Sequence, residues 1–152
     1  EGAKSLMVGS LVGLVGSGNE DVEANRSEVR FTSGYTGSVR ITVSVNDADV
    51  DKWLFVGGLL GRLNGRGDFV IEKDAPLTLQ CEMTFQKAYS DTDKRYEGVL
   101  IGYIDEGGCA SNESDRLSII CSGLETLYRL ENENSTATGF DDVTVTDPTA
   151  GS

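Results

Sequence analysis

Three aspartates with alternate spacing are the first candidates for chemistry in this sequence. Asp47, Asp49 and Asp51 match the first ligands of a calcium-binding EF-hand loop. That loop requires glycine at its sixth position and glutamate at its twelfth, whereas this chain has Lys52 and Gly58 there. The pattern therefore argues against calcium, and we expect no metal and no cofactor. The aspartates are better explained as the capped start of a helix, where carboxylates accept hydrogen bonds from free backbone amides.

The residue inventory also argues against catalysis. The chain contains no histidine, which removes the commonest general base and the commonest zinc ligand. A Ser-His-Asp or Cys-His nucleophile cannot be assembled within it. Its carboxylates are dispersed, and no glycine loop matches a phosphate-binding or dinucleotide-binding pattern. We therefore expect no catalytic residue and no enzymatic activity.

The three cysteines divide into two kinds. Cys81 and Cys121 lie in apolar, strand-like runs and are predicted to be small buried hydrophobic residues. Cys109 lies in a glycine-rich loop, where it is either an inert thiol or a candidate for an intersubunit disulfide.

Two short surface motifs carry little information. Arg66-Gly67-Asp68 matches an adhesion tripeptide, but it is also ordinary turn chemistry before a strand. The sequons at Asn25, Asn112 and Asn134 are expected by chance in a chain rich in serine and threonine.

Length and charge favour one soluble domain spanning residues 1–152, with residues 1–27 as an extended or mobile arm. The chain has 13 basic and 25 acidic residues, for a formal net charge of −12. Such a surface repels nucleic acid and anionic membranes. No run of the sequence is long and apolar enough for a transmembrane helix.

Alternating apolar residues predict a mainly β fold. The strongest patterns are "VRITVSV" from Val39 and "LTLQCEMTF" from Leu77. Residues 96–104 are predicted to be a central strand that forms a hairpin with the second of these, and residues 116–123 to be another strand that continues through 124–130. "DVTVT" is predicted to be a short edge strand. We expect an antiparallel β-barrel or sandwich with one flanking α-helix, and we find no solenoid-type repeat.

The expected helix covers about residues 49–63 and is apolar nearly all round. Gly57 and Gly58 are unfavourable inside a helix by about 1 kcal/mol each, which suggests close approach by another backbone. One interpretation is contact with a neighbouring subunit, and the alternative is burial within the monomer. The first predicts an interface made of Trp53, Leu54, Phe55, Gly57, Gly58 and Leu59.

The order of these elements resembles the tail tube proteins of tailed bacteriophages and the tube subunits of contractile machines. The likeness rests on residues 38–61, 77–104 and 116–130, and on pattern rather than a specific motif. The resemblance implies a virion subunit that forms stacked hexameric rings, contacts sheath or other tail proteins, and conducts DNA without binding it. The alternatives are a capsid decoration or accessory virion protein, and an extracellular filament or adhesion subunit.

Overall fold

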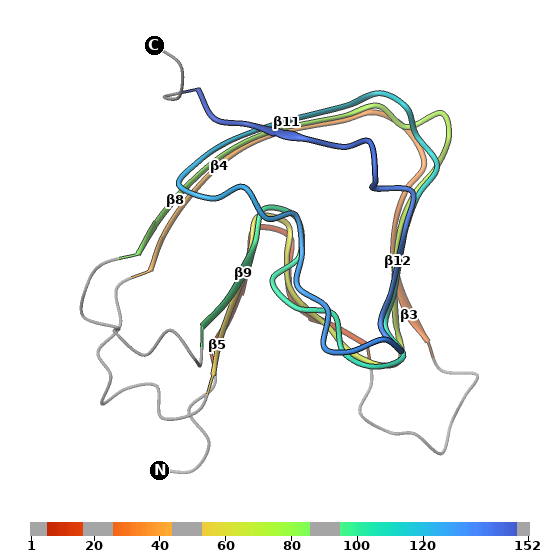
Figure 1. Ribbon diagram of the computed structural model, residues 1–152. Coiled ribbons are helices and arrows are strands. Elements are labelled where there is room, and N and C mark those ends of the chain that lie inside the picture. Colours follow the sequence, from red (N-terminus) through yellow and green to blue (C-terminus); the bar gives the residue numbers. More distant parts are fainter. Residues whose placement is uncertain (1–5, 17–25, 44–52, 86–94, 149–152) are drawn as a thin grey trace.

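All the strand pairs in the protein are parallel across the residues that the structure describes. The computed structural model describes residues 6–16, 26–43, 53–85 and 95–148. Within these ranges the secondary structure is β-strand without any helix (Figure 1). The strands are β1 Leu6–Gly9, β2 Val12–Val15, β3 Ser27–Phe31, β4 Tyr35–Val43, β5 Leu54–Gly57, β6 Leu60–Leu63, β7 Gly67–Ile71, β8 Leu77–Phe85, β9 Arg95–Gly98, β10 Cys109–Asn112, β11 Leu117–Ser122, β12 Thr136–Thr138 and β13 Val145–Thr146.

The chain winds into stacked coils. The four sheets have the strand orders β1-β5-β9, β2-β6, β12-β10-β7-β3 and β13-β11-β8-β4. Each sheet thus takes at most one strand from each pass of the chain, and Figure 1 shows successive passes lying over one another. This arrangement is a parallel β-solenoid. We name its passes coil 1 (residues 6–43), coil 2 (53–85), coil 3 (95–122) and coil 4 (123–148).

The expected antiparallel barrel or sandwich with a flanking helix is therefore wrong. The predicted hairpin is also wrong, because β8 pairs with β4 and β11, whereas β9 pairs with β5 in another sheet. β9 ends at Gly98 and lies at a sheet edge, and residues 99–104 make only isolated bridges. Residues 124–130 form no strand and contribute one bridge at Leu130.

The alternating strand patterns were predicted correctly. In β8, Leu77, Leu79, Cys81 and Met83 are buried, and the residues between them lie on the outer face. The neighbouring strands are in register, so that Val39, Cys81 and Cys121 form one inward-facing column across β4, β8 and β11. β13 lies at the edge of this sheet, as expected.

Of the residues predicted to form a helix, 49–52 lie outside the described residues, and 54–63 form the strands β5 and β6 with a sharp bend between them. Coils 1 and 3 bend at the corresponding place, so Gly9, Gly57 and Gly98 lie in one column. A Cβ atom on Gly57 would overlap the carbonyl oxygen of Leu60, and one on Gly58 would overlap the carbonyl oxygen of Val99 in coil 3. The glycine pair does meet another backbone, but that backbone belongs to the next coil of the same chain.

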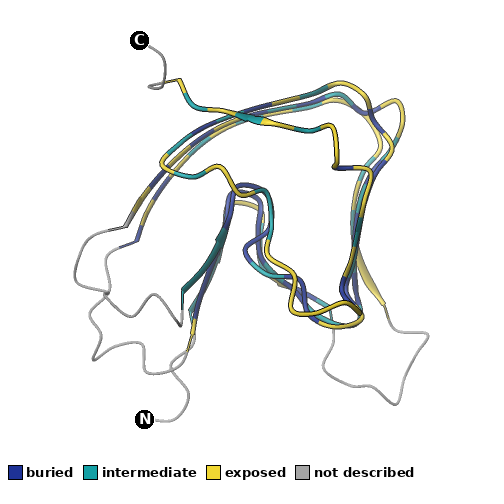
Figure 2. Cartoon of the chain, in the orientation of Figure 1, coloured by how far each residue is buried: buried dark blue, intermediate teal, exposed yellow. Residues whose placement is uncertain are grey.

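The core is a continuous apolar column enclosed by the coils. Its largest fully buried side chains include Phe69, Leu54, Leu59, Leu60 and Leu63. Figure 2 shows buried residues concentrated along the stacked strands and around the central bend, whereas coil 4 is mostly exposed or half-buried. The absence of an internal repeat was a wrong prediction, because the coils repeat the same bend and the same inward columns.

Candidate assembly interface

The six residues predicted to form an interface do not form one exposed surface. Leu54, Phe55 and Leu59 are at most 2% exposed, and the two glycines are also buried. Trp53 alone is exposed, at 43%. Burial within the same chain, the alternative interpretation, describes five of the six, and the described part of the expected helix, residues 53–63, is not helical.

A column of leucines runs through the bend of all four coils and shows where the core ends. The amide groups of Leu11, Leu59 and Leu100 donate to the carbonyl oxygens of Leu59, Leu100 and Leu127, each at 3.0 Å. Leu59 and Leu100 are fully buried, whereas Leu11 in coil 1 is 45% exposed. The residue type and the position are the same in these three coils. Leu11 is therefore exposed because none of the described residues covers it from the far side.

A second column shows the same effect at the opposite end. Val15, Leu63, Ile104 and Leu130 follow one another through coils 1 to 4. The first three are at most 5% exposed, whereas Leu130 is 45% exposed. Each end of the described stack thus presents a leucine at a position that is apolar and buried in the middle of the stack.

Three ion pairs connect the outer face of coil 1 to coil 2. They are Arg26–Asp68 at 2.7 Å, Arg30–Glu72 at 2.6 Å and Arg40–Glu82 at 3.6 Å. The arginine lies in coil 1 and the carboxylate in coil 2 in all three. Because these side chains are partly or largely exposed, each pair contributes at most about 1 kcal/mol to stability, and their main effect is on register.

Arg62 and Asp105 make a better protected pair between coils 2 and 3. The guanidinium donates two hydrogen bonds to the carboxylate, at 2.9 and 2.8 Å. The bonds to Asp105 raise the pKa of Arg62, although its partial burial acts in the opposite direction. The guanidinium also lies 4.8 Å from the centre of the Phe55 ring. Coils 2 and 3 are therefore joined by charge as well as by the backbone ladder.

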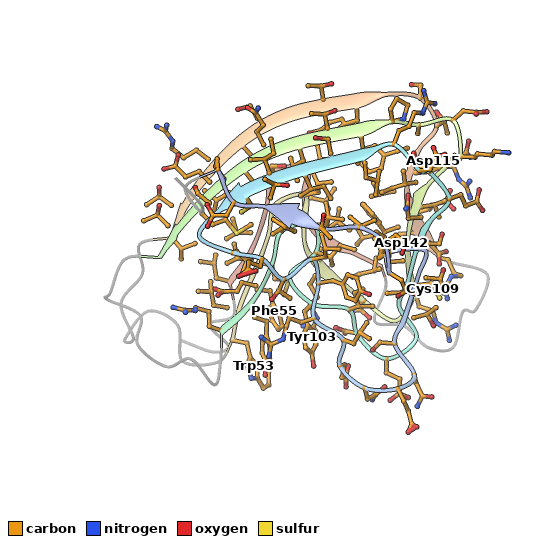
Figure 3. The ribbon with its side chains drawn as sticks, turned by 45° about the horizontal axis from the view of Figure 1, so that its top comes forward. Trp53, Phe55, Tyr103, Cys109, Asp115 and Asp142 are labelled. Atoms are coloured by element: carbon orange, nitrogen blue, oxygen red, sulfur yellow. The ribbon has the colours of Figure 1, made fainter. Side chains whose placement is uncertain are left out.

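Phe55 belongs to an aromatic cluster on the outer side of the bend. The ring centres of Phe55 and Tyr96 are 5.4 Å apart and nearly parallel, and Tyr103 lies 5.4 and 4.6 Å from these two rings. Figure 3 places Trp53, Phe55 and Tyr103 together on one side of the molecule. The cluster accounts for the burial of Phe55, which the helical pattern had assigned to an intersubunit contact.

The adhesion tripeptide is part of the fold. Gly67 begins β7 and is buried, and a Cβ atom there would lie 2.7 Å from the carbonyl oxygen of Val15. Asp68 accepts two hydrogen bonds from Arg26, at 2.9 and 2.7 Å. The aspartate is thus already engaged with an arginine of coil 1, and the interpretation as strand-start chemistry is favoured.

The sequon at Asn112 is inaccessible. Its side-chain amide donates to the carbonyl oxygens of Ser114 at 2.9 Å and Gly139 at 2.8 Å, and its carbonyl oxygen accepts from the Ser114 amide. Asn112 therefore ties β10 to coil 4. Asn134 is exposed, and Asn25 lies outside the described residues.

The cysteines occupy two environments, as expected. Cys81 and Cys121 are buried neighbours in β8 and β11, and the hydrogen bond between their thiols raises the pKa of Cys81 and lowers that of Cys121. Cys109 is a free, half-buried thiol on the side of the molecule opposite Trp53 (Figure 3). An intersubunit disulfide at Cys109 stays a prediction, which non-reducing gel electrophoresis checks.

Three further features bear on other functions. Asp47, Asp49 and Asp51 lie outside the described residues, as does the whole segment between β8 and β9, residues 86–94. Within the described ranges, no group of three or more Cys, Asp or Glu side chains is placed to hold a metal ion. The same ranges contain no helix that could span a bilayer.

The ends of the stack, which form the candidate interface, were not predicted from the sequence. The signal that could have found them is the recurrence of G-x-x-x-G at Gly9, Gly57 and Gly98, each time enclosing an apolar pair.

Comparison of the chain with protein-family models, with curated proteins and with solved structures gave no match.

Proposed function

We propose that this chain is a structural module that self-assembles by stacking its terminal coils. The observation that carries the proposal is the exposure of Leu11, a residue whose counterparts Leu59 and Leu100 are fully buried. The surface that Leu11 presents is the uncovered cross-section of a core. Covering it with another coil is the solution that the rest of the molecule already uses.

The terminal strands support the same proposal. β3 and β4 lie at one edge of the two four-stranded sheets, and β12 and β13 lie at the other. A sheet edge presents backbone donors and acceptors that favour pairing with another strand. Covering the exposed 45% of one such leucine side chain adds about 0.7–1.4 kcal/mol. Edge pairing and leucine burial therefore act on the same end surfaces.

The narrower role of a phage tail tube subunit is a proposal with less support. It rested on a helix and a long hairpin, and the described residues contain neither. Both versions of the proposal include self-assembly of a β-rich subunit. The two uncovered ends of the stack support that common element. Electron micrographs distinguish the two versions, because a tube subunit forms rings with a lumen and a stacking solenoid forms thin rods.

The test compares two leucines of coil 1 that are almost equally exposed. Leu11 is 45% and Leu14 is 42% exposed, but only Leu11 continues a buried column, since Leu14 aligns with the outward-facing Arg62. We expect sedimentation velocity to show association of the unmodified protein as its concentration rises. Leu11→Gln should weaken this association about three- to tenfold, because stacking would bury only the exposed 45% of the side chain, roughly half of a full leucine burial.

Leu14→Gln is the matched control and should associate like the unmodified protein. A protein that stays monomeric at every concentration would contradict the proposal. So would equal effects of the two substitutions, because general surface hydrophobicity would then explain the association.

A further inference from the structure

We infer that the assembly is polar, with coil 1 of one copy stacked on coil 4 of the next. This inference rests on the proposed self-assembly and adds its partner surface and its direction. The partner is a second copy of this chain, and it presents the opposite end of its stack. Head-to-tail stacking of this kind continues indefinitely, whereas head-to-head or tail-to-tail contacts stop at a dimer.

The backbone hydrogen bonds favour this direction. At the bend, the amide of each leucine donates to the leucine of the following coil, from Leu11 to Leu59, from Leu59 to Leu100 and from Leu100 to Leu127. In a head-to-tail stack the series continues, and the Leu127 amide of one copy meets the Leu11 carbonyl group of the next. A head-to-head contact would reverse the strand direction across the junction and break the parallel pattern that all the described sheets share.

The side-chain columns match in the same orientation. The first column would run from Leu127 of one copy to Leu11 of the next, and the second from Leu130 to Val15. Both exposed leucines would then face the next apolar residue of their own column. Stacking in the opposite direction would bring Leu11 opposite another Leu11 and would leave Leu130 exposed.

Charge changes steadily along the stack. Coil 1 carries three arginines against one glutamate, coil 2 three basic against four acidic residues, coil 3 two against five, and coil 4 one against six. The comparison covers the described residues; residues 17–25, which lie outside them, add three acidic residues by sequence. Among the described residues, the most basic coil and the most acidic coil are the two terminal ones.

Complementary charge therefore selects between the possible contacts. A head-to-tail junction places the acidic coil 4 beside the arginines of coil 1, whose Arg26–Asp68 and Arg30–Glu72 pairs already face coil 2 on the other side. A tail-to-tail junction would bring twelve acidic residues together. Like charges across an interface suppress the wrong partner more strongly than matched charges strengthen the right one.

Cross-linking between two single-site variants tests the direction. In a Cys109→Ser background, Leu11→Cys and Leu127→Cys are prepared separately and oxidised mildly, alone and as a mixture. Head-to-tail stacking brings these two positions together only between different variants. We expect a covalent dimer from the mixture and none from either variant alone, and Leu14→Cys mixed with Leu127→Cys should give no dimer.

The outcomes separate the two proposals. A covalent dimer from Leu11→Cys alone would show head-to-head contact, which overturns the polarity and leaves self-assembly standing. A covalent dimer from Leu127→Cys alone would show tail-to-tail contact with the same consequence. No dimer from any mixture, together with a monomeric unmodified protein in sedimentation, would overturn both.

A charge reversal tests the electrostatic part. Asp142→Lys changes an exposed residue of coil 4, and Asp74→Lys makes the same change on exposed surface of coil 2. Both variants lower the net repulsion between copies equally. We expect Asp142→Lys to weaken association about three- to tenfold relative to Asp74→Lys. Equal association of the two variants would overturn the role assigned to the charge gradient.

Discussion

The middle coils and the terminal coils contain equivalent residues in different surroundings. Leu59 and Leu100 lie at the same point of the bend as Leu11, and Leu63 and Ile104 lie in the same column as Leu130. The four middle residues are fully buried, whereas Leu11 and Leu130 are 45% exposed; Val15, at the coil 1 end of the second column, is 5% exposed. In a solenoid, each coil buries its apolar face only against its neighbours, so a coil at the end remains half covered. The difference places the closed core in the middle of this molecule and the proposed association at its ends.

The largest expected effect separates Leu59 from Leu11. Leu59→Ala should lower the free energy of unfolding by about 3 kcal/mol, because it leaves a cavity in a core that is closed on both sides. Leu11→Ala should cost less than about 1 kcal/mol in dilute protein, since the side chain is already half in water. Equilibrium unfolding in urea measures both. Equal losses would mean that coil 1 is covered as completely as coil 2.

The next effect concerns the backbone contact between middle coils. Gly58→Ala should cost about 2–3 kcal/mol, because its Cβ atom would overlap the carbonyl oxygen of Val99 in the following coil. Gly34→Ala is the control, since the nearest atom to a Cβ there is 3.5 Å away, on Pro76. Thermal unfolding of the two variants gives the comparison. If Gly58→Ala is as stable as Gly34→Ala, the coils are not packed at backbone distance.

The smallest expected effect on stability concerns Glu97, a carboxyl group in a column of otherwise apolar side chains. Val8, Val56 and Glu97 align across β1, β5 and β9, so coil 3 has a carboxyl group where coil 2 has a fully buried valine. Burial raises the pKa of Glu97, although nearby Arg95 and Arg129 act against it. Arg95 Nε lies 3.1 Å from Glu97 Oε2, but that oxygen has no hydrogen-bond partner, so we treat burial as the dominant cause.

A raised pKa in the folded state favours the protonated carboxyl group. The associated stability is fully present below the ordinary pKa of glutamate and is lost as the pH rises through the folded value. Glu97→Gln should therefore match the unmodified protein near pH 4 and exceed it at pH 7, by less than about 1 kcal/mol. The melting temperature across this pH range measures the gain, with outward-facing Glu82→Gln as control. A gain that is the same at both pH values would rule out this explanation.

The individual strands could be predicted from the sequence, but their partners could not. Alternation in β4, β8 and β11 is a local property, because successive side chains of a strand point to opposite faces. Whether β8 pairs with the strand that follows it or with one about 40 residues away depends on contacts that local pattern does not contain. A polar loop after β8 fits a hairpin and a further coil equally well.

The helix was predicted wrongly for a related reason. Residues 54–63 are apolar at nearly every position, so helical spacing and a strand buried on both faces both fit. The glycines at 57, 58 and 61 argued against a helix, and their recurrence in coils 1 and 3 was the stronger signal. The predicted interface residues were grouped on one face of that helix, and in the structure five of them are buried and Trp53 is exposed.

The sequence by itself determined the β-rich composition, the faces of the long strands, the burial of Cys81 and Cys121 and the strongly acidic surface, because these depend on residue type and on neighbours within a few positions. Only the tertiary structure decided that the strands are parallel, that Gly58 meets the same chain and that Leu11 and Leu130 are left uncovered. Those features depend on which coil lies above and below each residue. One leucine can be core or surface according to that position, and no local pattern distinguishes the two.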